Sequence, residues 1–176
     1  MKGDFFMKRL LIILAAVISV CVFNKSKNES VVIPSSSIRF RVVSNSNAPK
    51  DIKIKLDLKR KLEDYLYEKV AGAKNVNEAD GIVSLELNNI NELIRQNLMS
   101  DYFTVSYGMN YFPSKIYKGV VYDGGYYKSL VVTLGDGDGD NWWCVLFPPL
   151  CLVEDNETTG DVEYKLFVKS IIEKFR

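Results

Sequence analysis

The sequence predicts a single α+β domain behind an N-terminal signal or anchor segment, with a mixed or antiparallel sheet of four to five strands and helices packed on it. Two observations lead to this fold class. Apolar residues recur at helical spacing in the first half of the chain, and β-branched and aromatic runs separated by glycines follow Asp101. The 176 residues, 47% of them hydrophobic, suffice for one core.

The N-terminal segment has the pattern of an export signal. Lys8 and Arg9 precede an apolar run of about 14 residues, which is shorter than the roughly 20 residues that span a bilayer. It is either a cleaved signal peptide or an anchor that residues 8–24 provide. Cys21 suggests a lipid anchor, but Val20 is large for the residue before a lipidated cysteine. We expect three parts: residues 1–24 as signal or anchor, 25–37 as a polar linker, and 38–176 as the domain.

The elements of the domain follow from periodicity. Alternation in 38–42 predicts a strand, and apolar residues every four positions in 52–70 predict a helix that ends at Gly72. A second helical pattern spans 75–101, where Asn88-Asn89 is a candidate break. Strands are predicted in 102–108, 115–122, 128–135 and 142–147, with a hairpin turn at "YDGGYY" (122–127), and an amphipathic helix in 161–175.

Composition excludes several classes of function. The 23 basic residues are balanced by 22 acidic residues along the whole chain, so we expect no nucleic-acid partner. The chain contains no histidine, which excludes Ser-His-Asp and Cys-His catalysis and His-ligated zinc. We expect no cofactor.

The acidic run "GDGDGD" raises the question of a metal site. Asp136, Asp138 and Asp140 match the first three ligand positions of a calcium loop. Position 12, which needs a glutamate, is Phe147 in this frame, and Pro149 if the frame begins at Asp138. We therefore favour a solvated connection between two strands over a metal site.

Cys144 and Cys151 enclose six residues, including Pro148-Pro149. Proline bends the chain, which allows the two sulfurs to approach each other, and export would expose them to a non-reducing compartment. We predict a disulfide, with buried free thiols as the alternative. A disulfide closing so short a loop stabilises a fold by about 2–3 kcal/mol.

The run from Trp142 to Val153 contains no charged side chain. So much apolar surface belongs either to the core or to a surface for a partner. Our candidates for partner contact are Asn141, Trp142, Trp143, Phe147, Pro148 and Pro149. If Trp143 contacts a partner, Trp143→Ala abolishes function at little cost in stability.

The stretch "GDNWWCVLFPPLC" closely resembles the signature of the stage II sporulation protein R family. The resemblance extends to "SIRFRVVSNSNAPKDIKIKLDLKRKL" and to "YFPSKIYKGVVYDGGYYKSLVVTLGDGDGD", and covers about residues 38–153. It implies a signalling protein of endospore formation that is not itself an enzyme. Members are made in the forespore and secreted into the space between forespore and mother cell. There they activate a membrane-embedded aspartic protease of the mother cell, which processes the precursor of a sigma factor.

Two functional hypotheses follow. The first is a secreted ligand that binds the external face of this protease and contacts the membrane only through the N-terminal segment. The second is an exported metal-dependent hydrolase or calcium-binding module that uses Asp136, Asp138 and Asp140.

Overall fold

A computed structural model of the chain describes residues 31–151 and 161–175. The predicted signal or anchor segment lies outside the described residues. Within the described residues no helix is both long and apolar enough to cross a bilayer. The elements are β1 (Val31–Val32), β2 (Ile38–Val43), α2 (Pro49–Val70), α3 (Val76–Leu98), β3 (Phe103–Phe112), β4 (Lys115–Tyr117), β5 (Val120–Tyr122), β6 (Gly125–Leu134), β7 (Asn141–Phe147) and α5 (Asp161–Lys174).

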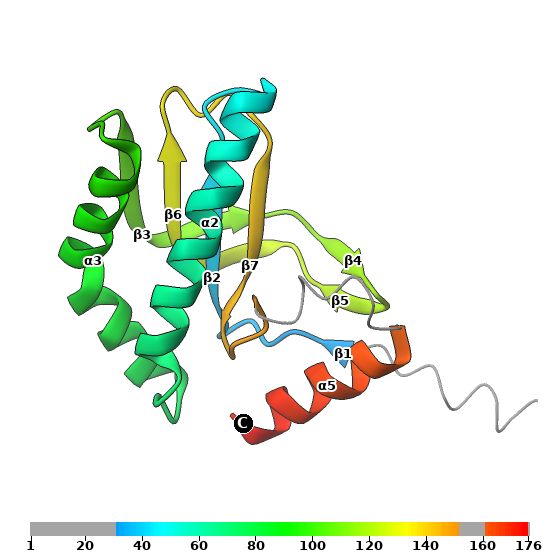
Figure 1. The fold of residues 1–176 in the computed structure, drawn as a ribbon. Helices are drawn as coiled ribbons and strands as arrows, with labels where there is room; N and C mark the ends of the chain where they lie inside the picture. Colours follow the sequence, from blue (N-terminus) through cyan, green and yellow to red (C-terminus); the bar gives the residue numbers. More distant parts are fainter. Residues whose placement is uncertain (1–30, 152–160, 176) are drawn as a thin grey trace, which may run out of the picture. The chain divides into compact units, whose positions relative to one another are not determined.

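The main sheet has four strands in the order β3-β6-β2-β7 (Figure 1). Strand β2 runs parallel to β6 and antiparallel to β7, and β3 runs antiparallel to β6. The sheet is therefore mixed, and the predicted α+β class is confirmed. The alternation of β2 places Phe40 and Val42, both fully buried, in the first of two hydrophobic cores.

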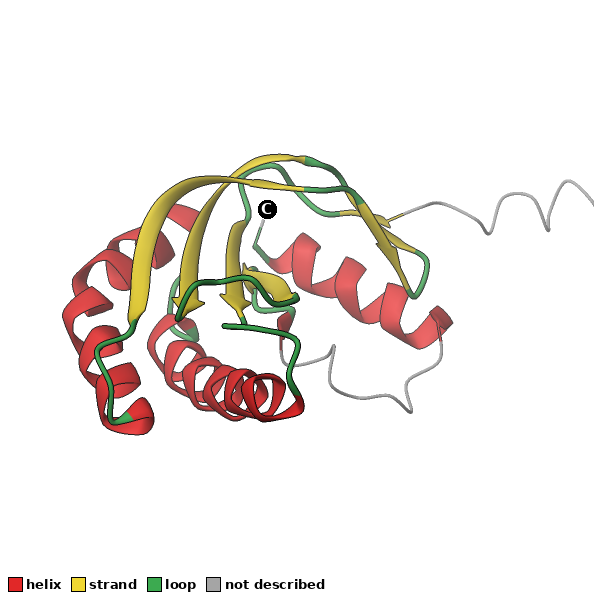
Figure 2. Cartoon of the chain, turned by 90° about the horizontal axis from the view of Figure 1, so that it is seen from above, coloured by secondary structure: helices red, strands yellow, loops and turns green. Residues whose placement is uncertain are grey.

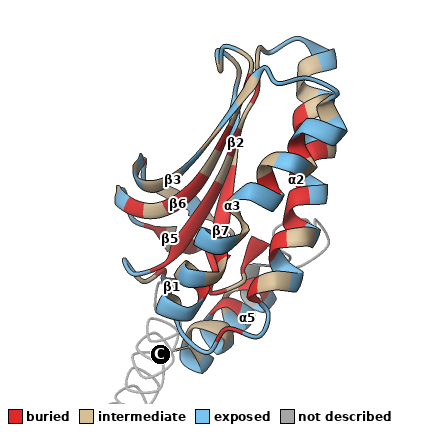
Figure 3. Ribbon diagram, turned by 90° about the vertical axis from the view of Figure 1, so that its left-hand side faces the viewer, coloured by how far each residue is buried: buried red, intermediate tan, exposed pale blue. Residues whose placement is uncertain are grey.

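Helices α2 and α3 cover one face of this sheet, and their buried sides face the strands (Figure 3). Leu58, Leu62 and Leu66 of α2 recur at i, i+4 and are at most 2% exposed, which is the pattern that predicts this helix. Helix α3 continues through Asn88-Asn89, contrary to the candidate break. Both asparagines are exposed, and the buried stripe of α3 continues on either side of them.

Strands β3 and β6 pair antiparallel over ten residues, and the part of this ribbon beyond the pairing with β2 bends out of the main sheet and continues into the hairpin β4–β5 (Figure 2). The hairpin turn lies at Lys118-Gly119, which have φ of 46° and 71°. The predicted turn at 122–127 is wrong, because that segment is the bend of the ribbon. Gly124 is required there, since a Cβ would lie 2.9 Å from the backbone nitrogen of Ser114.

A second, three-stranded sheet has the order β1-β5-β4, with β1 parallel to β5. Ile33, directly after β1, is 2% exposed and belongs to the second core. Residues 31–37, which the sequence places in the linker, therefore contribute a strand and a core side chain. The pairing partner lies about 90 residues away, so no local pattern indicates it.

Helix α5 packs on the second core through Tyr164 and Val168, which are both fully buried. Tyr164 is hydrogen-bonded to Tyr122 through their hydroxyl groups at 2.6 Å. Leu166, by contrast, is 64% exposed. The two cores lie on opposite faces of β7, because its alternate side chains belong to different clusters.

Candidate partner-binding surface

Strand β7 directs its two tryptophans to opposite faces, as alternation along a strand requires. Trp142 contacts Phe40 on the α2 side, with ring centroids 5.7 Å apart. Trp143 contacts Phe112 and Tyr122 in the second core, at 5.4 Å and 5.7 Å. All three ring pairs are edge-to-face, an arrangement that adds stability beyond the area buried.

The burial of the six candidate contact residues separates them into two groups. Trp143, Phe147 and Pro148 are buried, with Trp143 8% exposed and Phe147 2% exposed. Because Trp143 is buried, we expect Trp143→Ala to cost stability, contrary to what a surface contact would imply. The residues that retain exposed surface are Asn141, which is exposed, and Trp142 and Pro149, which are half-buried.

The structure contains the disulfide that the sequence predicts between Cys144 and Cys151, whose Cα atoms are 5.3 Å apart. Both residues are buried. The loop that the disulfide closes is further held by a hydrogen bond of 3.1 Å from the N–H of Leu150 to the carbonyl oxygen of Val145. The end of β7 is thus fixed by one covalent and one hydrogen bond.

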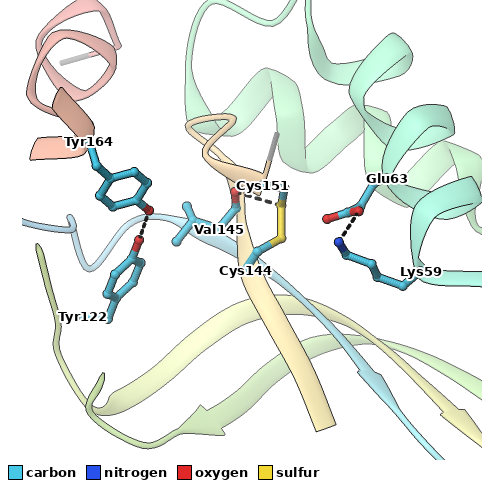
Figure 4. Close-up of a disulfide and its surroundings, with 7 residues drawn as sticks. All are labelled: Lys59, Glu63, Tyr122, Cys144, Val145, Cys151 and Tyr164. Atoms are coloured by element: carbon cyan, nitrogen blue, oxygen red, sulfur yellow. Dashed lines mark hydrogen bonds and ion pairs between the residues drawn. A yellow bond between two sulfur atoms is a disulfide. The ribbon is translucent and has the colours of Figure 1, made fainter. Parts of the chain in front are cut away.

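A buried ion pair of α2 lies beside the disulfide (Figure 4). Lys59 Nζ is 2.9 Å from a carboxylate oxygen of Glu63, and both side chains are nearly inaccessible to solvent. Glu63 and the two sulfurs are the one group of three potential metal ligands that the described residues bring within 4.8 Å. Because the sulfurs are bonded to each other, they do not supply thiolate ligands, so this group is structural.

The structure gives the acidic run the role of a connection between β6 and β7. Asp136, Asp138 and Asp140 are exposed and do not form a group of converging ligands among the described residues. The N–H groups of Asp136 and Asp140 donate to the side-chain oxygens of Asn45 and Asn47 at 3.0 Å and 2.7 Å. The hypothesis of a metal module at these aspartates finds no geometric support.

The same loop, residues 44–47, also holds the start of α2. Ser46 and Asn45 donate to a carboxylate oxygen of Asp51 at 2.6 Å and 2.9 Å. These hydrogen bonds hold the pKa of Asp51 below its ordinary value of 3.8. The N-cap residue, Ala48, has no capping side chain, and Pro49 occupies the first turn. The Asn/Ser-rich run therefore joins β2, α2 and the β6–β7 connection.

A groove of about 680 Å³ runs along α2. We call it the α2 groove. The described residues that line it all come from α2 and are apolar, basic or acidic: Pro49, Ile52, Leu56, Lys53, Lys59, Arg60 and Asp57. Leu56 is 43% exposed. Lys59 Nζ also lies 4.4 Å from the centroid of the Trp142 ring, so the α2 groove borders β7 at this tryptophan.

Strand β7 is an edge strand, and no described strand pairs with its outer side. The carbonyl of Val145 accepts its hydrogen bond from Leu150, outside the sheet. Because both polar backbone groups of a residue in an antiparallel strand point to the same side, those of Val145 point outward. The period of two then places the backbone groups of Asn141 and Trp143 on this outer edge as well.

Arg39 is a buried cation that no sequence pattern indicates. It is fully buried on β2, and its guanidinium carbon lies 3.5 Å from the Tyr127 ring centroid and 5.0 Å from that of Trp143. Burial lowers its pKa, because the charged form loses its hydration. Electron-rich rings offset part of that cost, so Arg39 stabilises the side of β7 that carries Trp143.

Comparison with known proteins assigns the chain to a family. The model of the family described as "Stage II sporulation protein R" matches residues 34–157. The chain is 33% identical over 156 residues to "Stage II sporulation protein R" of Bacillus subtilis (strain 168), which covers 85% of this chain and 70% of that protein. No solved structure matches. The matched region contains the whole main sheet, α2, α3 and the disulfide. The chain belongs to the stage II sporulation protein R family and is a sporulation protein.

Proposed function

We propose that this protein is an exported signal of endospore formation that activates a membrane-embedded aspartic protease. The protein crosses the forespore membrane, reaches the space between forespore and mother cell, and binds the external face of the protease. The protease then processes the precursor of a sigma factor. In this proposal the chain acts by binding and carries out no chemical step itself.

The observation that carries the proposal is membership of the stage II sporulation protein R family over most of the chain. Two features are consistent with a ligand that binds in an ordered form. A buried disulfide holds the end of β7, and the exposed α2 groove borders this strand at Trp142. A surface that is ordered before binding loses less conformational entropy when a partner docks. Such a ligand activates by binding the active state of the protease more tightly than the inactive state.

Co-expression in a bacterium that does not sporulate tests the proposal. The full chain, the membrane-embedded aspartic protease of the same organism and the sigma-factor precursor are produced together, and cleavage is followed by immunoblot. We expect cleavage with all three proteins and none when the chain is omitted. A variant of the protease with its catalytic aspartate replaced by asparagine is the matched control. If the precursor stays intact although all three proteins accumulate, the proposed function is wrong.

A further inference from the structure

We propose that the partner docks an extended acidic segment along the outer edge of β7, where it adds a strand to the main sheet and places side chains in the α2 groove. This inference rests on the proposed function, because it names the surface through which the protease is recognised. It requires three properties of the surface: free backbone groups, an apolar groove, and an excess of basic side chains.

The outer edge of β7 supplies the free backbone groups. Asn141 and Trp143 point their N–H groups away from β2, and no described strand receives them, whereas the outer edge at Val145 is already occupied by Leu150. An edge strand that exposes such groups is a template for an additional strand. Recognition by strand addition obtains its affinity from these main-chain hydrogen bonds and its specificity from pockets that receive alternate side chains.

The α2 groove supplies a pocket for those side chains. Side chains of an added strand alternate between the two faces of the sheet, and one set points to the face that α2 covers. Ile52 and Leu56 line the groove on this helix, and Lys59 connects it to Trp142 of β7. Trp142 and Asn141 were candidates for partner contact, and both retain surface here.

Charge selects the partner. Among the described residues, Lys53, Lys59 and Arg60 line the groove together with Asp57. Lys59 is buried and paired with Glu63, so the excess of positive charge comes from the exposed Lys53 and from Lys50, which precedes it on the same helix. Asp57 pairs with Arg60, and the ion pairs of the described residues leave Lys53 without a carboxylate. A segment whose side chains on the α2 face include both acidic and apolar residues complements this surface, and like charges would be excluded.

A second exposed patch provides the alternative location. Tyr111 and Tyr126 are 56% and 70% exposed on the ribbon β3–β6, with ring centroids 5.6 Å apart. Strand β3 is the other edge of the main sheet, and the guanidinium of Arg41 donates to the carbonyl oxygen of Tyr111 there. The patch therefore serves as a comparison surface in the test.

The test combines charge reversal with hydrogen exchange. The variant K53E/R60E reverses two exposed charges of the α2 groove, and K74E/K169E reverses two exposed charges elsewhere. Each full-length variant is titrated against the detergent-solubilised protease and assayed for precursor cleavage. We expect K53E/R60E to bind at least about tenfold more weakly, with a matching loss of cleavage, because like charges across an interface cost several kcal/mol. We expect K74E/K169E to behave as the wild type.

Amide exchange in the complex tests strand addition directly. We expect the amides of Asn141 and Trp143 to become protected when the protease binds. If K53E/R60E unfolds below the temperature of the binding assay, the variant Leu56→Asp is titrated in its place. Leu56 lines the same groove and is already partly exposed, so its substitution should disturb the fold little.

The outcomes separate the inference from the proposed function. If the wild type binds and cleaves while K53E/R60E equals it, the docking surface is wrong and the proposed function stands. A third variant, Y111S/Y126S, removes the exposed rings of the comparison surface. If this variant loses binding while K53E/R60E keeps it, the docking surface is wrong. Unchanged exchange of the β7 amides in the complex also overturns the docking surface. If the wild type neither binds nor triggers cleavage, the proposed function fails, and the docking surface fails with it.

Discussion

Trp142 and Trp143 are neighbours in sequence but have different roles, because β7 separates them onto two faces. Trp143 lies among the rings of Phe112 and Tyr122 and beside the buried Arg39 guanidinium. Trp142 is half-buried between Phe40 and Lys59. The sequence indicates that this run is either core or contact surface, and the structure divides it between the two.

Because Trp143 is buried and Trp142 is half-buried, replacing them should lower the free energy of unfolding by different amounts. Trp143→Ala removes a buried aromatic side chain and should lower the free energy of unfolding by about 3–5 kcal/mol. Trp142→Ala removes a partly exposed ring and should cost clearly less. Urea unfolding of both variants measures the difference. Equal losses would mean that the two rings are equally buried in solution.

The disulfide should contribute to stability independently of the tryptophans. Reduction opens an eight-residue loop and should lower the free energy of unfolding by about 2–3 kcal/mol, because the unfolded chain regains conformational freedom. The double variant C144S/C151S should show a similar loss in urea unfolding. If unfolding of the oxidised and reduced protein coincides, the bond does not constrain the native protein as described.

Asp51 should make the free energy of unfolding depend on pH. Its pKa is lower in the folded state, because Ser46 and Asn45 donate to its carboxylate. The contribution is therefore fully present above pH 3.8 and is lost as the pH falls through the lowered value. The free energy of unfolding of the wild type should fall more between pH 6 and about 3 than that of Asp51→Asn. Parallel pH profiles of the two proteins would contradict this assignment.

At the scale of elements, the shape of the β6–β7 connection depends on its glycines. A Cβ on Gly139 would collide with the backbone oxygen of Ser46, and Gly135 and Gly137 have positive φ of 56° and 74°. The aspartate side chains are exposed.

Substitutions of a glycine and of an aspartate in the β6–β7 connection should have different effects on stability. Gly139→Ala forces the backbone of the 44–47 loop to move and should cost about 1–3 kcal/mol. Asp138→Ala, the matched control, should change stability by no more than about 0.5 kcal/mol. Thermal unfolding compares them. A larger loss in Asp138→Ala would show that its carboxylate has a structural partner.

The sequence predicts most helices and strands of the main sheet, because their patterns are local. Leu58, Leu62 and Leu66 recur every four residues, and β2 alternates. It misses β1, whose partner β5 is far away in the sequence, and the turn at Lys118-Gly119, where "YDGGYY" gives a stronger local signal. The pairing of β1 depends on a long-range contact that local propensity does not contain, whereas the turn at Lys118-Gly119 is local and is missed because glycines elsewhere give the stronger signal.

The candidate surface could be predicted in part. Asn141 and Trp142 lie in the uncharged run that indicates a contact surface. The sequence also contains a pattern that indicates the α2 groove, because Ile52 and Leu56 lie outside the buried stripe of α2 and alternate with lysines. That β7 is an edge strand could not be predicted, because strand order depends on the pairing of β2 with β6.

At the scale of the domain, one strand connects the two hydrophobic cores. β7 contributes Cys144 and Leu146 to the core under α2, and Trp143 and Val145 to the core under α5. Its outer edge remains without a described partner strand. Because the strand is held on both faces and by the disulfide, its edge is ordered before a partner arrives, which favours binding.

The most direct test of the central claim is activation of the protease by the purified protein. The protease and the sigma-factor precursor are reconstituted in lipid vesicles, the oxidised full chain is added from the side that corresponds to the outside of the mother cell, and precursor cleavage is measured over time. The account predicts cleavage that rises with the concentration of added protein and saturates, and none when the protein is added from the opposite side. An intact precursor at every concentration, with a protease shown to be competent, would contradict it.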